Sequence, residues 1–405
     1  MNMEKYTVII PTRDRAETLV ATLRTCLRQT YENFEIIVSD NCSDDNTKEI
    51  VDQLSDHRIK YINPGKRLSM SGNFEFALSH VNEGFVMFIG SDDGIMPYAI
   101  NYVDSIVKKY KVKAVSCQQA NYKWPNFFDN SLAGKIIFGR LRNGNGIEIR
   151  NTHDWIQKTL SFKTSYCYDL PNLYCGFVHK DIINKAYKDG VYFKSITPDA
   201  YSAFATAIFL ESYAFSYTPF VIAGASNKST GASVLLVSGD NKESNLYNTE
   251  NDIDICEGFI NCPSIEIICT EAFCKLAKNF PEQCSNYHID FQKMFIDAVS
   301  NSNNKTRDEV CKAVNKMKLN IPEFDKYNYS KDNINYIYSF YKLFCDVIKI
   351  LLNKPQIVEI SESHKIGIND VDEAGLVIYA MINYNKSKLF VTKKDLLFRR
   401  IKGKK

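Results

Sequence analysis

The amino-acid sequence predicts an α/β protein in which a doubly wound, mostly parallel sheet precedes a mainly helical C-terminal part. Over residues 1–118, short β-branched runs alternate with helical patterns, as in a series of strand–helix–strand units. Beyond about residue 250, helical patterns continue without clear strands. The chain has 405 residues and is 45% apolar, so it is long enough for two domains.

Five strands are expected in the first part of the chain. Each is a short run of β-branched and other apolar residues, and the first two runs end at Pro11 and Asp40. The expected strands cover residues 6–10, 34–39, 59–62, 85–89 and 114–117.

The segments between these strands have the pattern of crossover helices. Leu19 and Leu23 fall on one face of the first segment, and residues 43–47 supply polar caps for the second. A third helix is expected over residues 73–81, and Pro97 suits the first turn of a fourth. Right-handed crossovers of this length connect parallel strands, which completes a doubly wound sheet.

Composition argues against several classes of protein. The net charge of +3 does not favour nucleic acid as a partner, and the aromatic residues are spread along the whole chain. The twelve cysteines include no Cys-x-x-Cys pair, so reduced thiols are favoured over disulfides or a zinc site. Neither a signal peptide nor about 18 consecutive apolar residues is found. We therefore expect a cytoplasmic protein that does not span a membrane.

The run Ser91-Asp92-Asp93-Gly94 follows the fourth expected strand directly. Ligands of open α/β sheets collect at the carboxyl ends of strands, and Mg²⁺ or Mn²⁺ prefers carboxylate oxygens together with substrate phosphates. The run therefore indicates a site for a cation and a phosphate. A type I turn is the alternative, because Asp and Gly are common turn residues.

Two more polar clusters follow the first two strands. Residues 11–15 contain two arginines, and residues 40–45 contain three aspartates. Because the carboxyl ends of these strands meet at one edge of the sheet, both clusters should lie near residues 91–93. No Gly-x-Gly-x-x-Gly follows the first strand and no P-loop is present, which weakens a dinucleotide or P-loop interpretation.

Together, residues 8–15, 38–47 and 90–94 resemble the nucleotide-sugar glycosyltransferases of family 2, which have the GT-A fold. The resemblance covers about the first 120 residues closely and continues more loosely to about residue 240. It implies that residues 1–240 form a GT-A domain, divided into a nucleotide-binding half (1–118) and an acceptor half (119–240). The helical patterns further along the chain predict a helical accessory domain over residues 250–405.

The resemblance also implies how the donor is held. Asp40 would accept a hydrogen bond from the base, commonly uracil, and Asp92 and Asp93 would form the Asp-x-Asp motif, with Asp93 as the direct ligand of Mn²⁺ or Mg²⁺. Ser91 stands where the motif's first acidic residue is expected. Arg13 and Arg15 could instead be solvated surface charges, and Asn73 could merely cap the helix that follows it. The residues expected at the donor are Pro11, Thr12, Arg13, Arg15, Asp40, Asn41, Arg67, Asn73, Ser91, Asp92 and Lys228.

The acceptor half supplies the expected base. In family 2 an acidic residue that opens a helix after this strand is the catalytic base, and Asp199 is the best match, with a plain first-turn carboxylate as the alternative. His179 is a candidate third metal ligand or an ordinary hydrogen-bonded histidine. The residues expected near the acceptor are Tyr122, Trp124, Tyr174 and Gly176, where Trp124 could instead anchor a loop and Gly176 could mark a bulge.

Later segments suggest a lid, helices and a membrane contact. Residues 224–233 are small and polar, as in a mobile lid that would bring Lys228 to the diphosphate, with a disordered surface loop as the alternative. Residues 393–405 combine seven basic residues with four large apolar ones, which suits peripheral attachment to the inner membrane or a frayed tail. Helices are expected over residues 265–280, 289–299, 307–317 and 333–352.

These features predict an inverting, metal-assisted hexosyltransferase. It would move a sugar from a nucleotide-diphosphate donor, commonly a UDP-sugar, to a glycan or lipid-linked acceptor in the synthesis of capsule, O-antigen or lipopolysaccharide. A sugar-nucleotide nucleotidyltransferase and a non-catalytic nucleotide-sugar or glycan-binding protein are the alternatives. No nucleic acid partner is expected, and a homo-oligomer stays open.

Overall fold

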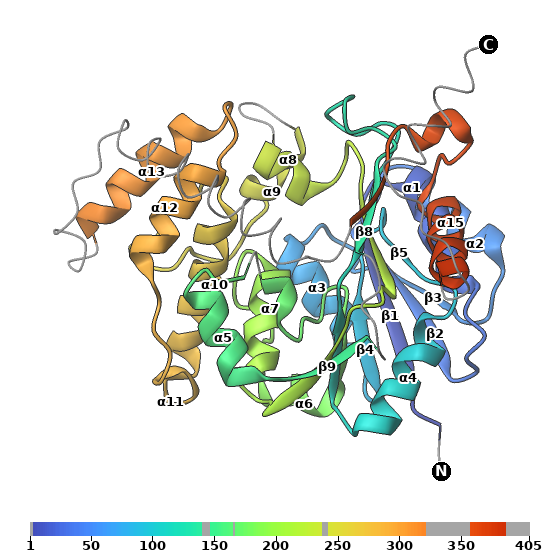
Figure 1. Ribbon diagram of the computed structural model, residues 1–405, viewed down its shortest axis with the longest axis horizontal. Coiled ribbons are helices and arrows are strands. Elements are labelled where there is room, and N and C mark those ends of the chain that lie inside the picture. Colours follow the sequence, from blue (N-terminus) through green and yellow to red (C-terminus); the bar gives the residue numbers. More distant parts are fainter. Residues whose placement is uncertain (1–2, 140–145, 165–166, 237–241, 321–356, 386–405) are drawn as a thin grey trace.

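The computed structural model describes residues 3–139, 146–164, 167–236, 242–320 and 357–385 (Figure 1). Its centre is a large sheet with the strand order β3-β2-β1-β4-β10-β6-β11-β9. Its strands are β1 (Tyr6–Thr12), β2 (Phe34–Asp40), β3 (Ile59–Ile62), β4 (Phe85–Phe88), β6 (Ala114–Cys117), β9 (Ile147–Asn151), β10 (Phe177–His179) and β11 (Ser212–Ser216).

The expected strands of the first part are confirmed. β1 pairs in parallel with β2 and β4, β2 pairs in parallel with β3, and β6 pairs in parallel with β11. β10 and β9 run antiparallel to their neighbours. Residues of β1 alternate between the two faces of the sheet, since Val8 and Ile10 lie in one apolar cluster and Ile9 in the other. The fold class, a doubly wound and mostly parallel α/β sheet, is therefore confirmed.

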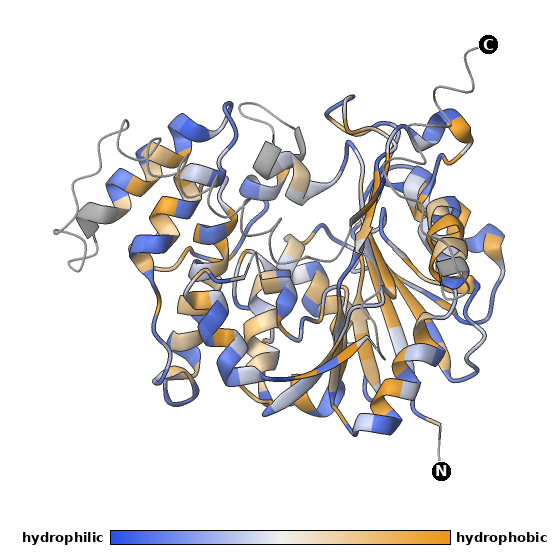
Figure 2. Ribbon diagram, viewed as in Figure 1, coloured by the Kyte–Doolittle hydropathy of each residue, from blue (hydrophilic) through white to orange (hydrophobic). Residues whose placement is uncertain are grey.

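Helices cover both faces of this sheet, and its apolar strands lie between them (Figures 1 and 2). One face carries α1 (Ala16–Leu27), α2 (Thr47–Leu54) and α4 (Ala99–Tyr110). The other carries α3 (Met70–Leu78), α5 (Thr152–Leu160), α6 (Lys180–Lys185) and α7 (Pro198–Ala207), next to the short helix η1 (Cys167–Asp169).

A second sheet, which the sequence did not predict, lies beside the first. Its order is β13-β8-β7-β12-β5. Its strands are β5 (Gly94–Ile95), β7 (Ala120–Lys123), β8 (Ile136–Gly139), β12 (Val221–Ala225) and β13 (Ile357–Ile360). These strands are short, and several carry polar residues on one side, so their sequence signal is weak.

The C-terminal part of the chain packs against two different regions of the fold. α10 (Ile265–Asn279) packs on α7, and α11 (Pro281–Cys284), α12 (Phe291–Asn301) and α13 (Arg307–Asn320) follow it, so three expected helices are found close to their expected bounds. β13, η3 (Ser363–Ile366) and α15 (Val371–Asn385) return instead to the second sheet and α1. The division at about residue 250 stays a prediction for residues 250–320, whereas residues 357–385 pack on the second sheet and on α1.

A bidentate ion pair connects α15 to the end of α1. The Arg28 guanidinium donates to both carboxylate oxygens of Asp372, at 2.6 and 2.7 Å.

Two expected segments, the helix at 333–352 and the basic segment 393–405, lie outside the described residues. Within the described part of the chain, no helix has the length and apolar character to cross a membrane. The described cysteines are free thiols, as expected from their spacing.

Candidate active site

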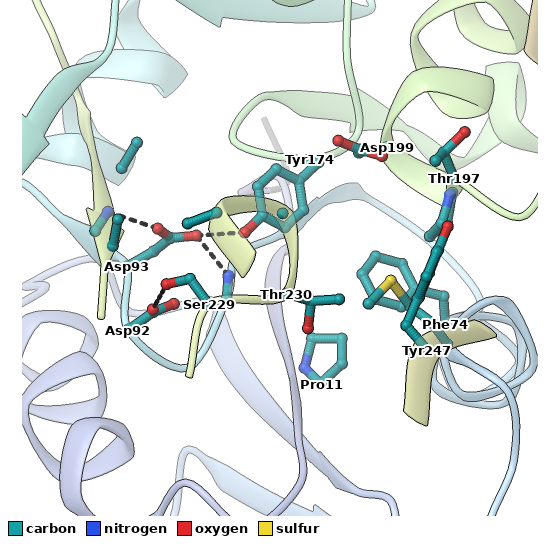
Figure 3. Close-up of a pocket in the computed structure, with 18 of the residues that line it drawn as sticks. Pro11, Phe74, Asp92, Asp93, Tyr174, Thr197, Asp199, Ser229, Thr230 and Tyr247 are labelled. Atoms are coloured by element: carbon teal, nitrogen blue, oxygen red, sulfur yellow. Dashed lines mark hydrogen bonds between the residues drawn. The ribbon is translucent and has the colours of Figure 1, made fainter. Parts of the chain in front are cut away.

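A cavity of about 480 Å³ opens at the carboxyl edge of β1, β2 and β4 (Figure 3). Its wall comes from the loops after these strands, from β7 and β12, and from the first turns of α7 and α10. Residues 229–232, Tyr247 and Glu250 complete it, at the start of α8 (Thr230–Leu236) and the end of α9 (Lys242–Thr249). The predicted site residues that line it are Pro11, Thr12, Arg13, Arg15, Asn41, Asn73, Asp92, Asp93, Tyr174 and Asp199.

Asp93 is buried at the centre of a hydrogen-bond network. Its Oδ2 accepts from the Gly90 amide at 2.7 Å and from the Tyr174 hydroxyl at 2.6 Å, and its Oδ1 accepts from the Gly224 amide at 2.7 Å. Burial, followed by the charge of Asp92, raises the pKa of this carboxyl to about 7, although the three hydrogen bonds act in the opposite direction. A bound cation would favour the ionised form.

Asp92 is held by segments that are distant in the sequence. Its Oδ2 accepts hydrogen bonds from the Ser226 amide at 3.1 Å, from the Ser226 hydroxyl at 2.8 Å and from the Ser229 hydroxyl. The Trp124 indole donates to the Asp92 carbonyl at 2.9 Å. A Cβ on Gly224 would lie 1.7 Å from that same carbonyl oxygen, so only glycine allows β12 to approach so closely. The acidic pair is therefore rigidly placed.

The two arginines of the first loop are engaged with the segment that follows β12. Arg13 forms an ion pair with Glu250, and Arg15 donates to the Lys228 carbonyl and, at 3.0 Å, to the Thr230 hydroxyl. The Lys228 ammonium donates at 2.6 Å to a carbonyl of the loop after β1, and its side chain is not part of the cavity wall. Residues 228–230 and Glu250 thus lie against the loop after β1 and are tied to it.

Asp40 lies at the same sheet edge as the acidic pair but behind the cavity wall. It is the register partner of Thr12, and β1 is the only strand between β2 and β4 in the sheet. Its carboxylate accepts from the Tyr61 hydroxyl at 2.6 Å and from the Ser43 amide at 3.0 Å. Ser91 is also fully buried outside the wall.

Other predicted donor residues shape the same edge. The Asn41 side chain exchanges hydrogen bonds of 2.8 and 2.9 Å with the backbone of Leu68, and the Asn73 side chain accepts from the Ser39 hydroxyl at 2.8 Å. Both amides line the cavity while they hold the loop before α3 against β2. Arg67 is outside the wall and pairs at 2.5 Å with a carboxylate of the loop after β2.

Asp199 lies on the opposite side of the cavity from Asp92 and Asp93 (Figure 3). It is half-buried in the first turn of α7, where the helix dipole favours a negative charge. Burial and then the charge of Asp199 raise the pKa of Tyr247, which also lines the cavity and donates to the Ile196 carbonyl at 2.7 Å. The base predicted from the sequence therefore faces the same cavity as the acidic pair.

The segment that precedes Asp199 is supported by α10. Glu271 is buried on α10, and its carboxylate accepts from the Ser195 hydroxyl at 2.9 Å and from the Cys256 amide at 2.8 Å. Burial raises the pKa of this carboxyl. The C-terminal helices are thus connected directly to the segment that precedes Asp199.

The structure does not bring His179 to the acidic pair, which corrects the prediction of a third metal ligand. His179 pairs with Phe85 at the amino end of β4, whereas Asp93 follows the carboxyl end of that strand. Its Nδ1 caps α6 by accepting from the Asp181 amide at 3.2 Å. This is the ordinary hydrogen-bonded role that the sequence left as the alternative.

Three residues expected at the acceptor lie outside the cavity wall. Tyr122 is fully buried under α15, where its hydroxyl donates to the Ile368 carbonyl at 3.4 Å. Trp124 anchors Asp92 instead of facing the cavity. At Gly176, a Cβ would lie 2.3 Å from the Asn172 carbonyl oxygen, so this glycine allows the chain to pack on itself. Of the four residues, only Tyr174 reaches the cavity.

Polar residues on the other side of β7, which the sequence did not indicate, also line the cavity. Gln119, just before the strand, and Asn121 and Lys123 within it face the cavity, while Ala120, Tyr122 and Trp124 are buried. Strand alternation could have indicated this pattern, but not which side faces the site. Burial lowers the pKa of Lys123, and the charges of Asp92 and Asp93 act in the opposite direction.

The acidic pair fits a divalent cation only as part of a shared site. Among the described residues, no three His, Cys, Asp or Glu side chains gather around one point. Mg²⁺ and Mn²⁺ are commonly held by one or two carboxylates, with substrate phosphates and water completing the coordination. Within the described part of the chain, the Asp92 Oδ1 has no hydrogen-bond donor, so it is the carboxylate oxygen most open to a cation.

Residues 7–165 match the family model described as glycosyl transferase family 2. This part of the chain is a family 2 glycosyltransferase domain, which confirms the family that the three motifs predicted. The GT-A fold expected for that family agrees with the sheet order described above.

Two relatives with assigned activities are similar to part of the chain. The chain is 30% identical over 137 residues to the Escherichia coli UDP-Glc:alpha-D-GlcNAc-diphosphoundecaprenol beta-1,3-glucosyltransferase WfgD, covering 33% of this chain and 52% of that protein. It is 32% identical over 136 residues to the Campylobacter jejuni GalNAc(5)-diNAcBac-PP-undecaprenol beta-1,3-glucosyltransferase, covering 33% and 40%. The chain therefore spans about half the length, or less, of these relatives.

A solved structure of S. aureus TarS in complex with UDP-GlcNAc is similar over 76% of this chain and 84% of that chain. The sequence identity is 15% and the TM-score is 0.42, which is too low to carry an argument about ligands or activity.

Proposed function

We propose that this chain is an inverting glycosyltransferase that moves a sugar from a nucleotide-diphosphate donor, a UDP-sugar, to a hydroxyl of a lipid-linked glycan in bacterial surface polysaccharide synthesis. The observation that carries the proposal is the placement of the acidic pair and Asp199 on opposite sides of one cavity in a family 2 domain. The names of the two relatives, which both act on undecaprenol-linked glycans, support the acceptor class.

The charge of the cavity supports a metal requirement. Among the described residues, three basic and four acidic side chains line it, so a diphosphate would meet no excess of positive charge. These side chains are Arg13, Arg15, Lys123, Asp92, Asp93, Asp199 and Glu250. Mn²⁺ or Mg²⁺ held by Asp92 and Asp93 would neutralise charge that develops on the leaving diphosphate.

Asp199 supplies the base in the proposed reaction. Its ionised carboxylate takes the proton from the acceptor hydroxyl, whose oxygen then attacks the anomeric carbon while the bond to the nucleotide diphosphate breaks. No protein nucleophile takes part in this single displacement, so the anomeric configuration inverts. Tyr168, which lines the cavity and is 42% exposed, offers an aromatic face on which a sugar ring can stack.

The loops after β1 and β2 hold the nucleotide in this proposal. Pro11, Thr12 and Asn41 line the cavity directly, and Asp40 lies one layer behind them. Asp40 therefore contacts the nucleotide base only if Tyr61 or the loop of Ser43, which now donate to its carboxylate, moves away. The arginines reach a diphosphate when their present partners move away, because Arg13 pairs with Glu250 and Arg15 donates to the Lys228 carbonyl and to Thr230.

The activity test uses a panel of UDP-, GDP-, dTDP- and CMP-sugars with Mn²⁺ and an undecaprenol-diphosphate-linked GlcNAc acceptor. We expect release of a nucleoside diphosphate together with a glycolipid that is one sugar longer and has the inverted anomeric configuration. Release of pyrophosphate would favour a nucleotidyltransferase. Donor binding without transfer or hydrolysis for every donor tested would favour a non-catalytic binding protein.

Attachment to the inner membrane through residues 393–405 belongs to the same proposal. The segment lies outside the described residues, and its seven basic residues carry the prediction. Sedimentation with anionic liposomes should fall when these residues are deleted, and equal pelleting of both chains would reject the attachment.

A further inference from the structure

Strand β7 and the residue before it present three polar side chains to the cavity beside the acidic pair. Gln119, Asn121 and Lys123 line the wall, whereas Tyr122 between them is fully buried. β7 pairs in parallel with β12, and Lys123 is the register partner of Ala225. The neighbours of Ala225 in the chain donate the amides that hold Asp93 and Asp92. The Lys123 side chain therefore enters the cavity next to the acidic pair.

The Lys123 ammonium differs from the other basic groups of the wall. Arg13 is paired with Glu250, and Arg15 donates to the Lys228 carbonyl and to Thr230. In the described part of the chain, the Lys123 Nζ has no hydrogen-bond or salt-bridge partner, and lies 4.7 Å from the centre of the Phe127 ring. Asp92 and Asp93 are the carboxylates whose charges act on it.

A half-buried ammonium without a hydrogen-bond acceptor is unfavourable unless a ligand supplies one. Lysine acts as a point charge toward phosphate, and it needs no fixed bidentate geometry. A cation on the acidic pair would bring a diphosphate to this corner of the cavity, within reach of the adjacent strand. The ligand chemistry that fits both neighbours is therefore a diphosphate oxygen.

We propose that Lys123 binds a phosphate oxygen of the nucleotide-diphosphate donor and stabilises the departing diphosphate together with the site at Asp92 and Asp93. This inference rests on the proposed function. It adds a residue from the second sheet, outside the three family motifs, to the donor site. The same chemistry is present in a lipid diphosphate acceptor, so the experiment separates the two sources.

The test compares wild type with Lys123→Met and Lys123→Arg by calorimetric titration of UDP and of uridine in the presence of Mg²⁺. Lys123→Met should weaken UDP binding by about tenfold, the effect of about 1.4 kcal/mol, and should leave uridine binding unchanged. Lys123→Arg should keep part of the affinity. Lys135→Gln is the matched control, because the Lys135 ammonium pairs at 2.9 Å with Glu359 and does not line the cavity. Melting curves confirm that each variant is folded.

Three outcomes would overturn the inference. Equal UDP affinity of wild type and Lys123→Met would remove Lys123 from the donor site. If the variant keeps UDP but loses affinity for farnesyl diphosphate, the residue serves the acceptor instead. If wild type binds neither UDP nor GDP, dTDP or CMP, the proposed function itself fails, and the inference fails with it.

Discussion

The two acidic sides of the cavity are built in opposite ways. Asp93 is 2% exposed and accepts three hydrogen bonds, from a strand end, from β12 and from Tyr174. Asp199 is half-buried at the open first turn of α7. A pair of carboxylates that holds an ion gains from a rigid position, because coordination tolerates little displacement. A base must reach a proton on an incoming hydroxyl, so it needs access.

The contrast indicates that Asp93 and Asp199 contribute to different steps of the proposed reaction. Changes around Asp93 should act on metal and donor affinity, whereas changes at Asp199 should act on the chemical step. The four substitutions or conditions that follow test this division.

The largest effect is expected from Asp199→Asn. An amide cannot take the proton of the acceptor, so kcat should fall by about 10³-fold, within the range for loss of a general base. Donor affinity should stay at the wild-type value, as measured by titration with UDP. Asp189→Asn is the control, since Asp189 is exposed and pairs with Lys194 at 3.4 Å, away from the cavity wall. Unchanged turnover of Asp199→Asn would remove this residue from the base role.

Tyr174→Phe should act on the other side. It removes the 2.6 Å hydrogen bond to Asp93, and a bond to a charged group contributes about 1.5–3 kcal/mol. We expect metal affinity to fall by about tenfold or more, with a matching rise in the KM of the donor. Tyr110→Phe on α4 is the control. A fall in kcat at saturating metal, without a change in metal affinity, would contradict the assignment.

The pH dependence of metal binding sharpens the comparison further. The raised pKa of Asp93 means that its ionised form is disfavoured in the metal-free fold, so metal-free stability falls as pH rises from about 4 to about 7. Mg²⁺ binds the ionised form, so its stabilising effect should grow over that window, with about tenfold tighter binding at pH 8 than at pH 6. Melting temperatures with and without MgCl₂ measure it, and Asp93→Asn should lack the trend. A pH-independent shift would contradict it.

The smallest effect is expected from Glu250→Gln. It releases Arg13 from its ion pair and removes one negative charge from the wall, so the Kd for UDP should fall by about threefold, the scale of a partly exposed pair. Glu257→Gln is the control, because Glu257 is 94% exposed. Weaker UDP binding of Glu250→Gln would show that this carboxylate contacts the donor.

The first half of the fold was predictable because the hydrophobic pattern and the geometry of parallel strands indicate the same arrangement. β1, β2 and β4 are continuous apolar runs, and their polar ends meet at one edge by the geometry of parallel strands. The acidic pair and the loop of Arg13 followed from that rule. The place of Asp199 came from the family resemblance and from the position of Pro198 in a first turn.

The predictions were wrong where the sequence does not show which face of a strand points to the cavity. Alternation along β7 separates Tyr122 from Lys123, but Tyr122, which was expected at the acceptor, faces the core under α15, and Lys123 faces the cavity. His179 was misplaced because an antiparallel strand puts its end at the opposite edge of the sheet. The return of residues 357–385 depends on pairing with β8, about 220 residues earlier, which no local pattern encodes.

The central claim is tested most directly by anomalous diffraction from a crystal of the protein grown with Mn²⁺ and UDP. The account predicts one strong manganese peak within coordination distance of Asp92 or Asp93, with the diphosphate in the same sphere and Lys123 beside it. A nucleotide bound in the cavity with no manganese at these carboxylates, or a peak elsewhere in the chain, would contradict it.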